Sequence, residues 1–303
     1  MPGFARRLGW ALLAYAALAW LPLAASEYHV HVYTMCLYYV ILAVGWNLLA
    51  GYTGQFSLAH HTFAGIGAYT SALLCLYFRA PILVGIAAGV VVAAAIGYGL
   101  GTLCLRMRAI YLALATWAFA ESMRLFVAVE YQITRGDLGL TLAALLVAWQ
   151  ILHSRVGSYL RAIRDDEEAA AVMGLDTFKW KRVAFVISAV FAAVAGGFEG
   201  HYIGLLSPTP MKFNEMAIIV IMVIAGGFRT FAGPVIGAVF IELLSEELRA
   251  WGEIRMVVFA LLVLVAARAY PAGLIGLGLT LGERLSRAVP ALAPLLTARP
   301  PAD

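Results

Sequence analysis

The chain has 303 residues, of which 63% are hydrophobic and only 13% are charged, and its mean hydropathy is +0.88. This composition excludes an ordinary soluble globular domain, in which about a quarter of the residues are charged. The formal net charge is +4, but the charged residues lie mainly in the segments between long apolar runs, so this charge does not indicate a nucleic-acid partner. The three cysteines stand singly in apolar runs, where we expect them to pack as small hydrophobic side chains.

Apolar runs of membrane-spanning length follow one another along nearly the whole chain. A transmembrane helix needs roughly 20 mostly apolar residues to cross about 30 Å of hydrocarbon. By this measure the fold is an all-α polytopic membrane bundle of about ten transmembrane helices. We expect them at about 8–26, 31–50, 57–78, 81–104, 109–129, 138–153, 183–205, 213–228, 231–248 and 254–270. The first run could also be a cleaved signal peptide with small residues at 24–26, but we prefer a retained helix.

The basic residues fall mainly on one side of these predicted helices. With the N-terminus inside, the cytoplasmic segments collect fifteen of the 21 lysines and arginines. Such an excess predicts that both termini are cytoplasmic. Residues 1–282 then form one membrane domain, and the proline-rich tail 283–303 is expected to be disordered.

Residues 155–182 break the apolar pattern with eleven charged side chains. Because they cannot sit in hydrocarbon, we expect a water-exposed cytoplasmic loop. The stretch from Ser158 to Met173 lacks glycine and proline, which predicts one helix. Gly174 is placed to end that helix, and Asp176 or Thr177 to begin the next one.

Two further features of this loop helix follow from residue spacing. Ion pairs between Arg161 and Asp165 and between Arg164 and Glu168 are expected at i,i+4. A modest apolar face is expected to lie against the bundle; it comprises Val156, Leu160, Ile163, Ala170 and Met173. The residues alone leave two interpretations open, a helix that docks on a soluble partner and a solvated connector.

Polar residues inside the predicted spans are candidates for a solute path. The glycine-rich stretch 51–67, with Gln55, Ser57 and Thr62, either lines a passage or forms a tight packing seam. Glu121 and Arg124 are spaced at i,i+3, so they can form an ion pair, which we interpret as structural. Glu199 faces either the path or the membrane interface. Glu242 lies one helical turn from Glu246, so a proton relay between these two carboxylates is an open interpretation.

Catalytic and metal-binding patterns are missing from the sequence. No histidine pair has i,i+4 spacing with a carboxylate in register, so no metal site is predicted. There is no glycine-rich phosphate-binding loop ending in Lys-Ser or Lys-Thr, so ATP is not hydrolysed by that route.

Four segments carry a resemblance to a known family. They are residues 51–69 (GYTGQFSLAHHTFAGIGAY), 108–116 (RAIYLALAT), 164–174 (RDDEEAAAVMG) and 226–238 (GGFRTFAGPVIGA). In order and spacing they resemble the branched-chain amino acid permeases of ABC importers. The form of the first segment is more similar to the LivM-type subunit than to its LivH-type partner.

The resemblance implies a non-enzymatic permease subunit in the bacterial inner membrane that works by alternating access. Its solute would be a branched-chain or hydrophobic amino acid, or a related small solute such as urea or an amide. The implied partners are a LivH-type permease, two ABC ATPase subunits that use ATP and Mg, a periplasmic solute-binding protein and membrane lipid. This chain itself would bind no cofactor.

The resemblance, together with the charged loop and the polar groups within the spans, suggests roles for particular residues. ATPase coupling would fall to the loop helix: Arg161, Arg164, Asp165, Asp166, Glu167, Glu168, Ala169, Ala170 and Gly174. The candidates for the pore and substrate path are Gly51, Gly54, Gln55, Ser57, His60, Thr62, Gly67, Thr116 and Glu199. The competing hypothesis is a secondary transporter driven by an ion gradient, with Glu199 or Glu242 as the coupling acid.

Overall fold

The computed structural model describes residues 26–105, 107, 109–127, 140–203 and 211–252, and isolated positions from 254 to 276. Within these residues every regular element is a helix, which confirms the all-α fold class. The predicted first helix at 8–26, most of the predicted last helix at 254–270 and the tail 283–303 lie outside the described residues.

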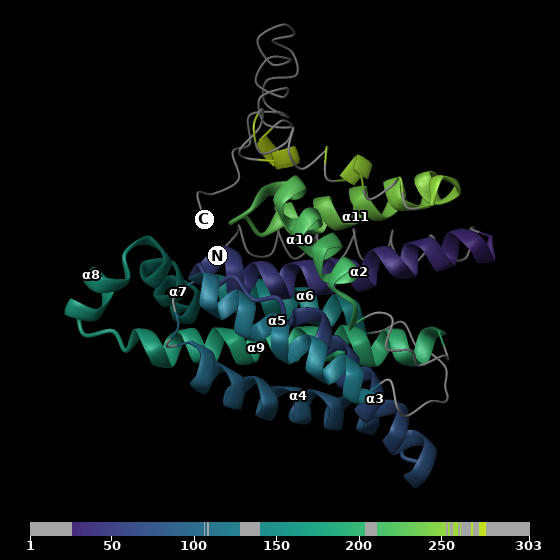
Figure 1. The fold of residues 1–303 in the computed structure, drawn as a ribbon, viewed down its shortest axis with the longest axis horizontal. Coiled ribbons are helices and arrows are strands. Elements are labelled where there is room, and N and C mark those ends of the chain that lie inside the picture. Colours follow the sequence, from purple (N-terminus) through teal and green to yellow (C-terminus); the bar gives the residue numbers. More distant parts are fainter. Residues whose placement is uncertain are drawn as a thin grey trace, which may run out of the picture.

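Four long helices form the centre of the bundle: α2 (Glu27–Thr53), α3 (His60–Phe78), α4 (Ile82–Cys104) and α9 (Thr177–Ile203). Helix α9 packs against each of the other three (Figure 1). The most apolar stretch of α2 is 83% buried, whereas that of α4, the most apolar of all, is only 28% buried. Helix α4 therefore presents apolar surface outward, as expected of a helix at the lipid boundary.

Small residues allow α3, α4 and α9 to approach very closely. Gly67 of α3 lies against the backbone of Ala193, and Gly196 of α9 lies against the backbone of Ala64. On the other side of α3, Gly89 of α4 lies against the backbone of Gly67. A Cβ atom at any of these glycines would overlap the facing main chain. This glycine seam (Gly67, Gly89 and Gly196) is a packing device common between membrane helices.

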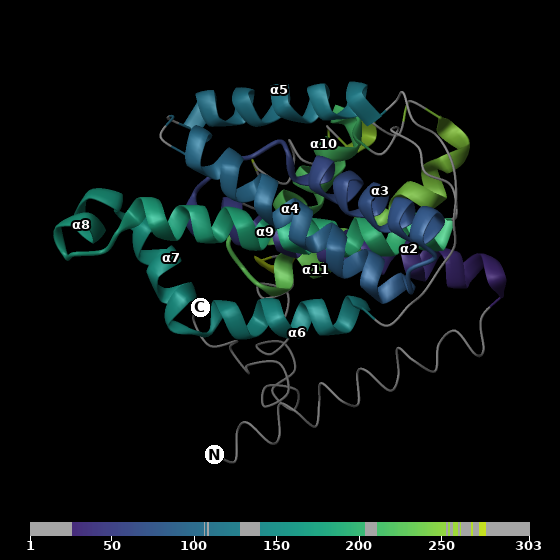
Figure 2. The same ribbon diagram turned by 90° about the horizontal axis from the view of Figure 1, so that it is seen from below.

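The bundle is flanked by two less buried helices. Helix α5 (Ala109–Val127) packs on α3 and α4, and α6 (Leu140–Leu152) packs on α2 and α9. Figure 2 shows α5 and α6 on opposite faces of the bundle. The bounds agree with the spans predicted at 109–129 and 138–153.

Helices α10 (Phe213–Gly227) and α11 (Ala232–Glu247) pack against each other and against α2, and the short helix η2 (Leu248–Trp251) follows. Their bounds match the predictions, but the two axes are bent by 119° at the short break between them. They form a broken span or a re-entrant pair. Within the described residues, α2, α4 and α9 are each long and apolar enough to cross a membrane, and the bent pair can supply a fourth span.

Contacts between distant residues identify the two ends of the bundle. One end is where α2 begins and α11 finishes. There the Tyr28 hydroxyl donates to Glu246 (2.6 Å), and His31 Nδ1 lies 3.2 Å from the Tyr202 hydroxyl of α9. At the other end α2 finishes at Thr53 and α9 begins at Thr177, beside the charged segment. We call this second end the charged end.

Candidate functional site

The charged segment forms two short helices rather than the single helix predicted over 158–173. Helix α7 (Arg155–Asp165) and helix α8 (Glu167–Val172) meet at Asp166, whose backbone is extended (φ −157°, ψ 105°). The Asp166 carboxylate accepts a hydrogen bond from Ala169 N (2.9 Å) and so caps α8. The prediction was wrong because an aspartate can satisfy free backbone donors at a new helix start, in competition with helix continuation. We call residues 155–176 the charged hairpin.

The end of the hairpin follows the predicted chemistry. Gly174 has φ +86°, and Leu175 N donates to Ala170 O (3.1 Å), so Gly174 is the left-handed residue that ends the helix. The Asp176 carboxylate accepts from Lys179 N (2.9 Å), which identifies Asp176 as the cap of α9. Helix α9 therefore starts before the span predicted at 183, and its first turns carry the charges of residues 179–182.

Neither predicted i,i+4 ion pair forms. Arg164 pairs instead with its neighbour Asp165 (2.7 Å), and a guanidinium nitrogen of Arg161 donates to Leu152 O (3.2 Å). The break at Asp166 accounts for the missing pair of Arg164 with Glu168, because Glu168 no longer lies one helical turn beyond Arg164. The other predicted pair lies within α7, and there Asp165 pairs with Arg164 instead of Arg161. Glu168 itself is exposed.

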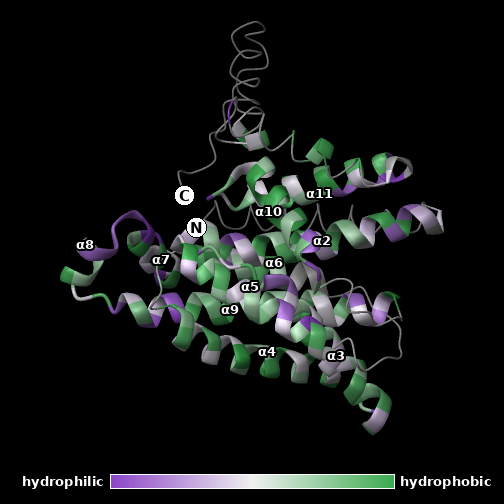
Figure 3. Cartoon of the chain, viewed as in Figure 1, coloured by the Kyte–Doolittle hydropathy of each residue, from purple (hydrophilic) through white to green (hydrophobic). Residues whose placement is uncertain are grey.

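A salt bridge from Glu167 to Lys181 (2.5 Å) links α8 to the first turns of α9. The two residues are distant in sequence and belong to different helices, so helical spacing gave no signal for the pair. Figure 3 shows hydrophilic residues concentrated on α7, α8 and this start of α9, beside the largely hydrophobic bundle.

The predicted apolar face of the hairpin is largely confirmed. Leu160 and Ile163 are buried, Ala170 is only 8% exposed, and Val156 is half-buried. Helix α7 uses this face to pack on α2, α6 and α9. Met173, however, is 87% exposed, because it lies beyond the end of α8 at Val172, in the turn that leads to α9.

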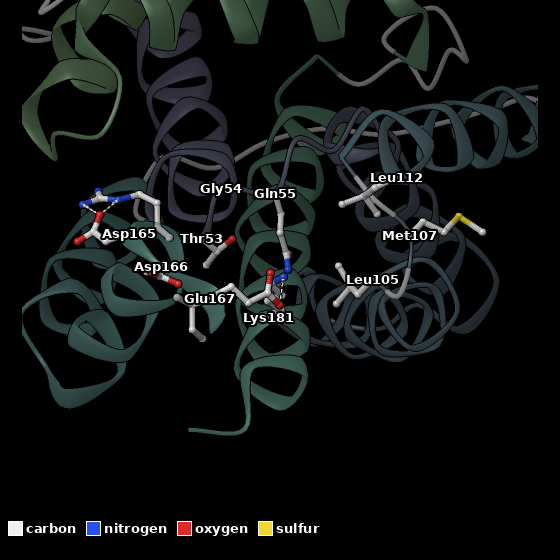
Figure 4. A pocket seen from close by; sticks show the side chains of 12 residues that line it. Thr53, Gly54, Gln55, Leu105, Met107, Leu112, Asp165, Asp166, Glu167 and Lys181 are labelled. Carbon is white, nitrogen blue, oxygen red and sulfur yellow. Dashed lines mark hydrogen bonds and ion pairs between the residues drawn. The ribbon is translucent and has the colours of Figure 1, made fainter. Parts of the chain in front are cut away.

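A pocket of about 480 Å³ lies between the charged hairpin and the ends of the neighbouring helices (Figure 4). Its wall brings together acidic, basic, amide and aliphatic groups: Thr53, Gly54, Gln55, Leu105, Met107, Leu112, Ile163, Arg164, Asp165, Asp166, Glu167 and Lys181. Three of the lining segments belong to α2, α8 and α9, so the pocket changes shape if the hairpin moves relative to the bundle.

Among the path candidates, Gly54 and Gln55 lie in this pocket, in the turn between α2 and α3. Gly54 is the left-handed C-cap of α2 (φ +71°), which explains the glycine there. The Gln55 side chain is 5% exposed, and neither amide atom has a hydrogen-bond partner among the described residues.

Other path candidates lie inside the bundle. The Thr116 hydroxyl accepts from Leu58 N (3.0 Å) and donates to Leu112 O (2.8 Å), which fastens α5 to the α2–α3 turn. His60 Nδ1 lies 3.0 Å from the Ser188 hydroxyl, and Ser57 is equally buried. The buried Thr62 hydroxyl has no hydrogen-bond partner in the described part of the chain.

The remaining candidates are dispersed. Gly51 lies against the Asn47 side chain, Gly67 belongs to the glycine seam, and Glu199 is half-buried on α9. The structure thus brings the coupling candidates together in one hairpin but does not gather the path candidates on one face. The predicted pair of Glu121 with Arg124 does form, on α5.

Asn47 is a connection that the sequence reading did not single out. Its amide donates to Thr230 O (2.9 Å), and its side-chain oxygen accepts from Arg229 N (3.3 Å), so it holds the break between α10 and α11 against α2. An asparagine in an apolar run needs partners when it is buried, and this was the available signal.

These features define a multi-pass helical membrane protein with a charged hairpin at one end of its bundle. Residues 28–141 and 138–267 match the family described as the permease component of the branched-chain amino acid transport system. The chain belongs to this family. The predicted resemblance is therefore confirmed, and the chain is a transporter permease and not itself an ATPase.

Individual relatives agree with this membership. The high-affinity branched-chain amino acid transport system permease protein LivM of Salmonella typhimurium is 28% identical over 86% of this chain and 72% of its own length. The corresponding protein LivH of Escherichia coli is 25% identical over 78% of this chain and 91% of its own length. The ribose import permease protein RbsC of Escherichia coli is 29% identical over 40% of each chain. No solved structure matches the chain.

Proposed function

We propose that this permease moves branched-chain or similarly hydrophobic amino acids across the bacterial inner membrane by alternating access. The family description and the similarity to LivM and LivH support this solute class. The similarity to both proteins supports pairing with a LivH-type permease, above two ATPase subunits that use ATP and Mg. A periplasmic binding protein would deliver the solute.

The charged hairpin is the observation that carries the coupling role. It is exposed and charged on one side, through Glu168 among others, and it is attached to the bundle on the other by Leu160, Ile163 and the bridge from Glu167 to Lys181. A hairpin of this kind transmits the closure of an ATPase to the helices that it touches. The coupling set is the predicted one: Arg161, Arg164, Asp165, Asp166, Glu167, Glu168, Ala169, Ala170 and Gly174.

The arrangement of charges supports an orientation with the charged end in the cytoplasm. That end gathers the basic residues of α7 and of the start of α9, while the opposite end holds Glu246 and Glu247. We infer from this orientation that the chain has about ten spans and that both of its termini are cytoplasmic. Residues 1–282 would form the membrane domain.

We assign the solute path to the polar groups around the α2–α3 turn. The buried Thr62 hydroxyl, which has no partner among the described residues, is the kind of group that a passing solute or water satisfies. Gln55 would mark the cytoplasmic end of this path, where the path meets the pocket. Ser57, His60 and Thr116 surround the same turn. Gly54 provides the left-handed backbone of the turn, Gly51 approaches Asn47 beside it, and Gly67 lies further along α3 in the glycine seam. Glu199 would face the path nearer the opposite end.

The coupling role is tested by the substitution Ala170→Pro in the complex reconstituted in vesicles. Ala170 N donates to Asp166 O (3.0 Å), and proline removes this donor from the first turn of α8. We expect normal insertion and retained ATP hydrolysis, but a loss of uptake of at least tenfold. Ala170→Ser keeps the N–H and the small volume, and should transport normally. Coupled uptake by Ala170→Pro at the wild-type rate would overturn the coupling role.

A further inference from the structure

The pocket beneath the charged hairpin is lined by charged, amide and aliphatic side chains that the hairpin would not need in order to dock on an ATPase. Its volume of about 480 Å³ falls in the range of about 300–1,000 Å³ that is usual for small-molecule sites. It lies on the bundle side of the hairpin, where α8 and α9 are joined by the bridge from Glu167 to Lys181.

The Gln55 amide is the strongest indication of a missing ligand. The side chain is 95% buried, given its exposed fraction of 5%, yet its donor and its acceptor both lack partners within the described residues. Burying an amide in this state is unfavourable, because it has lost water and gained no hydrogen bond. Figure 4 shows Gln55 pointing into the pocket on the side of Lys181 and Glu167.

Groups of opposite charge lie next to this amide. Lys181 supplies an ammonium group for a carboxylate, and Glu167 and Asp166 supply carboxylates for an ammonium group. A ligand with only one charge would leave half of this arrangement unused. A zwitterion uses all of it.

Another part of the lining is aliphatic. Leu105, Met107 and Leu112 lie across the pocket from Asp165 and Asp166 (Figure 4), and Ile163 of α7 adds an apolar group on the hairpin side. An apolar wall that faces a pair of opposite charges matches an α-amino acid with an aliphatic side chain, because each part of the molecule meets a complementary surface.

We propose that this pocket binds a free aliphatic α-amino acid on the side of the membrane that the charged hairpin faces. The carboxylate lies against Lys181 and Gln55, and the ammonium group against Glu167 and Asp166. Because Glu167 and Lys181 are paired at 2.5 Å in the structure, the ligand binds only when this bridge opens, and its binding so changes how α8 is held to α9. This inference rests on the proposed function. If the permease imports aliphatic amino acids, amino acid that has accumulated in the cytoplasm binds this pocket and slows further uptake.

The test is equilibrium binding of radiolabelled L-leucine to the purified full-length chain in lipid nanodiscs. Wild type should bind saturably, and Lys181→Gln and Gln55→Leu should each weaken binding at least tenfold. Lys179→Gln is the matched control, because Lys179 is exposed and does not line the pocket. It removes the same charge two residues away and should bind like wild type. 4-Methylpentanoate and isoamylamine, which each lack one of the two charges, should compete at least tenfold more weakly than leucine.

Two results would overturn the inference. One is the absence of saturable leucine binding to wild type. The other is equal binding by wild type, Lys181→Gln and Gln55→Leu, which would locate leucine elsewhere in the protein and leave the permease function untouched. Failure of the transport proposal has a different signature, namely leucine binding that depends on Lys181 in a complex that takes up no aliphatic amino acid. Thermal melting of each variant distinguishes loss of the site from loss of the fold. Lys181 lies in α9 and Gln55 in the α2–α3 turn, so a local folding defect in one variant does not affect the other.

Discussion

The glycine seam and the charged hairpin are built in opposite ways. The seam joins α3, α4 and α9 by direct backbone approach and contains no charged group. The hairpin packs on the bundle through a small apolar face and is joined to α9 by one salt bridge among the described residues. A seam of this kind has few alternative arrangements, whereas a salt bridge at a water-exposed site adds little stability.

This difference suits the transmission of a movement. A hairpin that can shift is useful only if the helices behind it move as one body. The seam provides that body, and Asn47 extends it by fastening the break between α10 and α11 to α2. Changes in the seam should therefore destabilise the protein, and changes in the hairpin should affect coupling first.

The largest effect is expected for Gly196→Ala in the seam. The new methyl group would overlap the backbone of Ala64, which cannot move without displacing α3. We expect a loss of about 3 kcal/mol in the free energy of unfolding, the upper end of the usual range for overpacking. Thermal unfolding in detergent measures it. Gly99→Ala on α4 is the control, since no atom of the described residues outside the local backbone of α4 lies within 4 Å of its Cβ position. Equal melting temperatures for the two variants would show that the seam is not tight.

A smaller effect is expected for Asn47→Ala. It removes the partners of Arg229 N and Thr230 O, and because these groups are only part-buried we expect a cost near the lower end of the range of about 1–3 kcal/mol for unpaired buried groups. Hydrogen exchange around residues 226–238 should become faster. Ser122→Ala, which removes an exposed hydroxyl bonded only within α5, should leave this exchange unchanged. Unaltered protection in Asn47→Ala would mean that the break is held by packing alone.

The smallest effect on stability is expected for Asp166→Ala, which removes the cap of α8. Loss of an N-cap costs about 1 kcal/mol, and here it should fray only residues 167–172. The melting temperature should stay the same while hydrogen exchange in α8 and the ratio of uptake to ATP hydrolysis both change. Asp166→Asn keeps a capping oxygen and should retain α8. If the Asn and Ala variants fray equally, the charge of Asp166 matters and its cap does not.

The sequence predicted several helices closely, but the two longest, α2 and α9, begin four and six residues before their predicted spans, and the connections were predicted poorly. Where a helix crosses hydrocarbon, the length of the apolar run determines its bounds, so α4 (Ile82–Cys104) and α10 (Phe213–Gly227) begin and end within a residue or two of the prediction. Gly174 and Asp176 were also predicted correctly, since turn and cap chemistry is local.

The features that sequence could not give depend on contacts between distant segments. Nothing near Lys181 indicates that it pairs with Glu167 on another helix, and nothing near Gly227 indicates the 119° bend. The break at Asp166 is intermediate, because the residue is a good cap but its neighbours favour helix. Of the candidate site, the location of the coupling residues was therefore predictable, whereas the pocket behind them was not.

The sidedness of the charged hairpin is the most direct test of its role. Met173 is 87% exposed at the tip of the hairpin, and Phe78 is 79% exposed at the far end of α3. Each is replaced by cysteine in a background whose three native cysteines are alanine, and vesicles of known orientation are treated with a membrane-impermeant maleimide. We predict that Met173→Cys is labelled only in inside-out vesicles, and Phe78→Cys only in right-side-out vesicles. Labelling of Met173→Cys in right-side-out vesicles would contradict the assignment of the hairpin to a cytoplasmic ATPase.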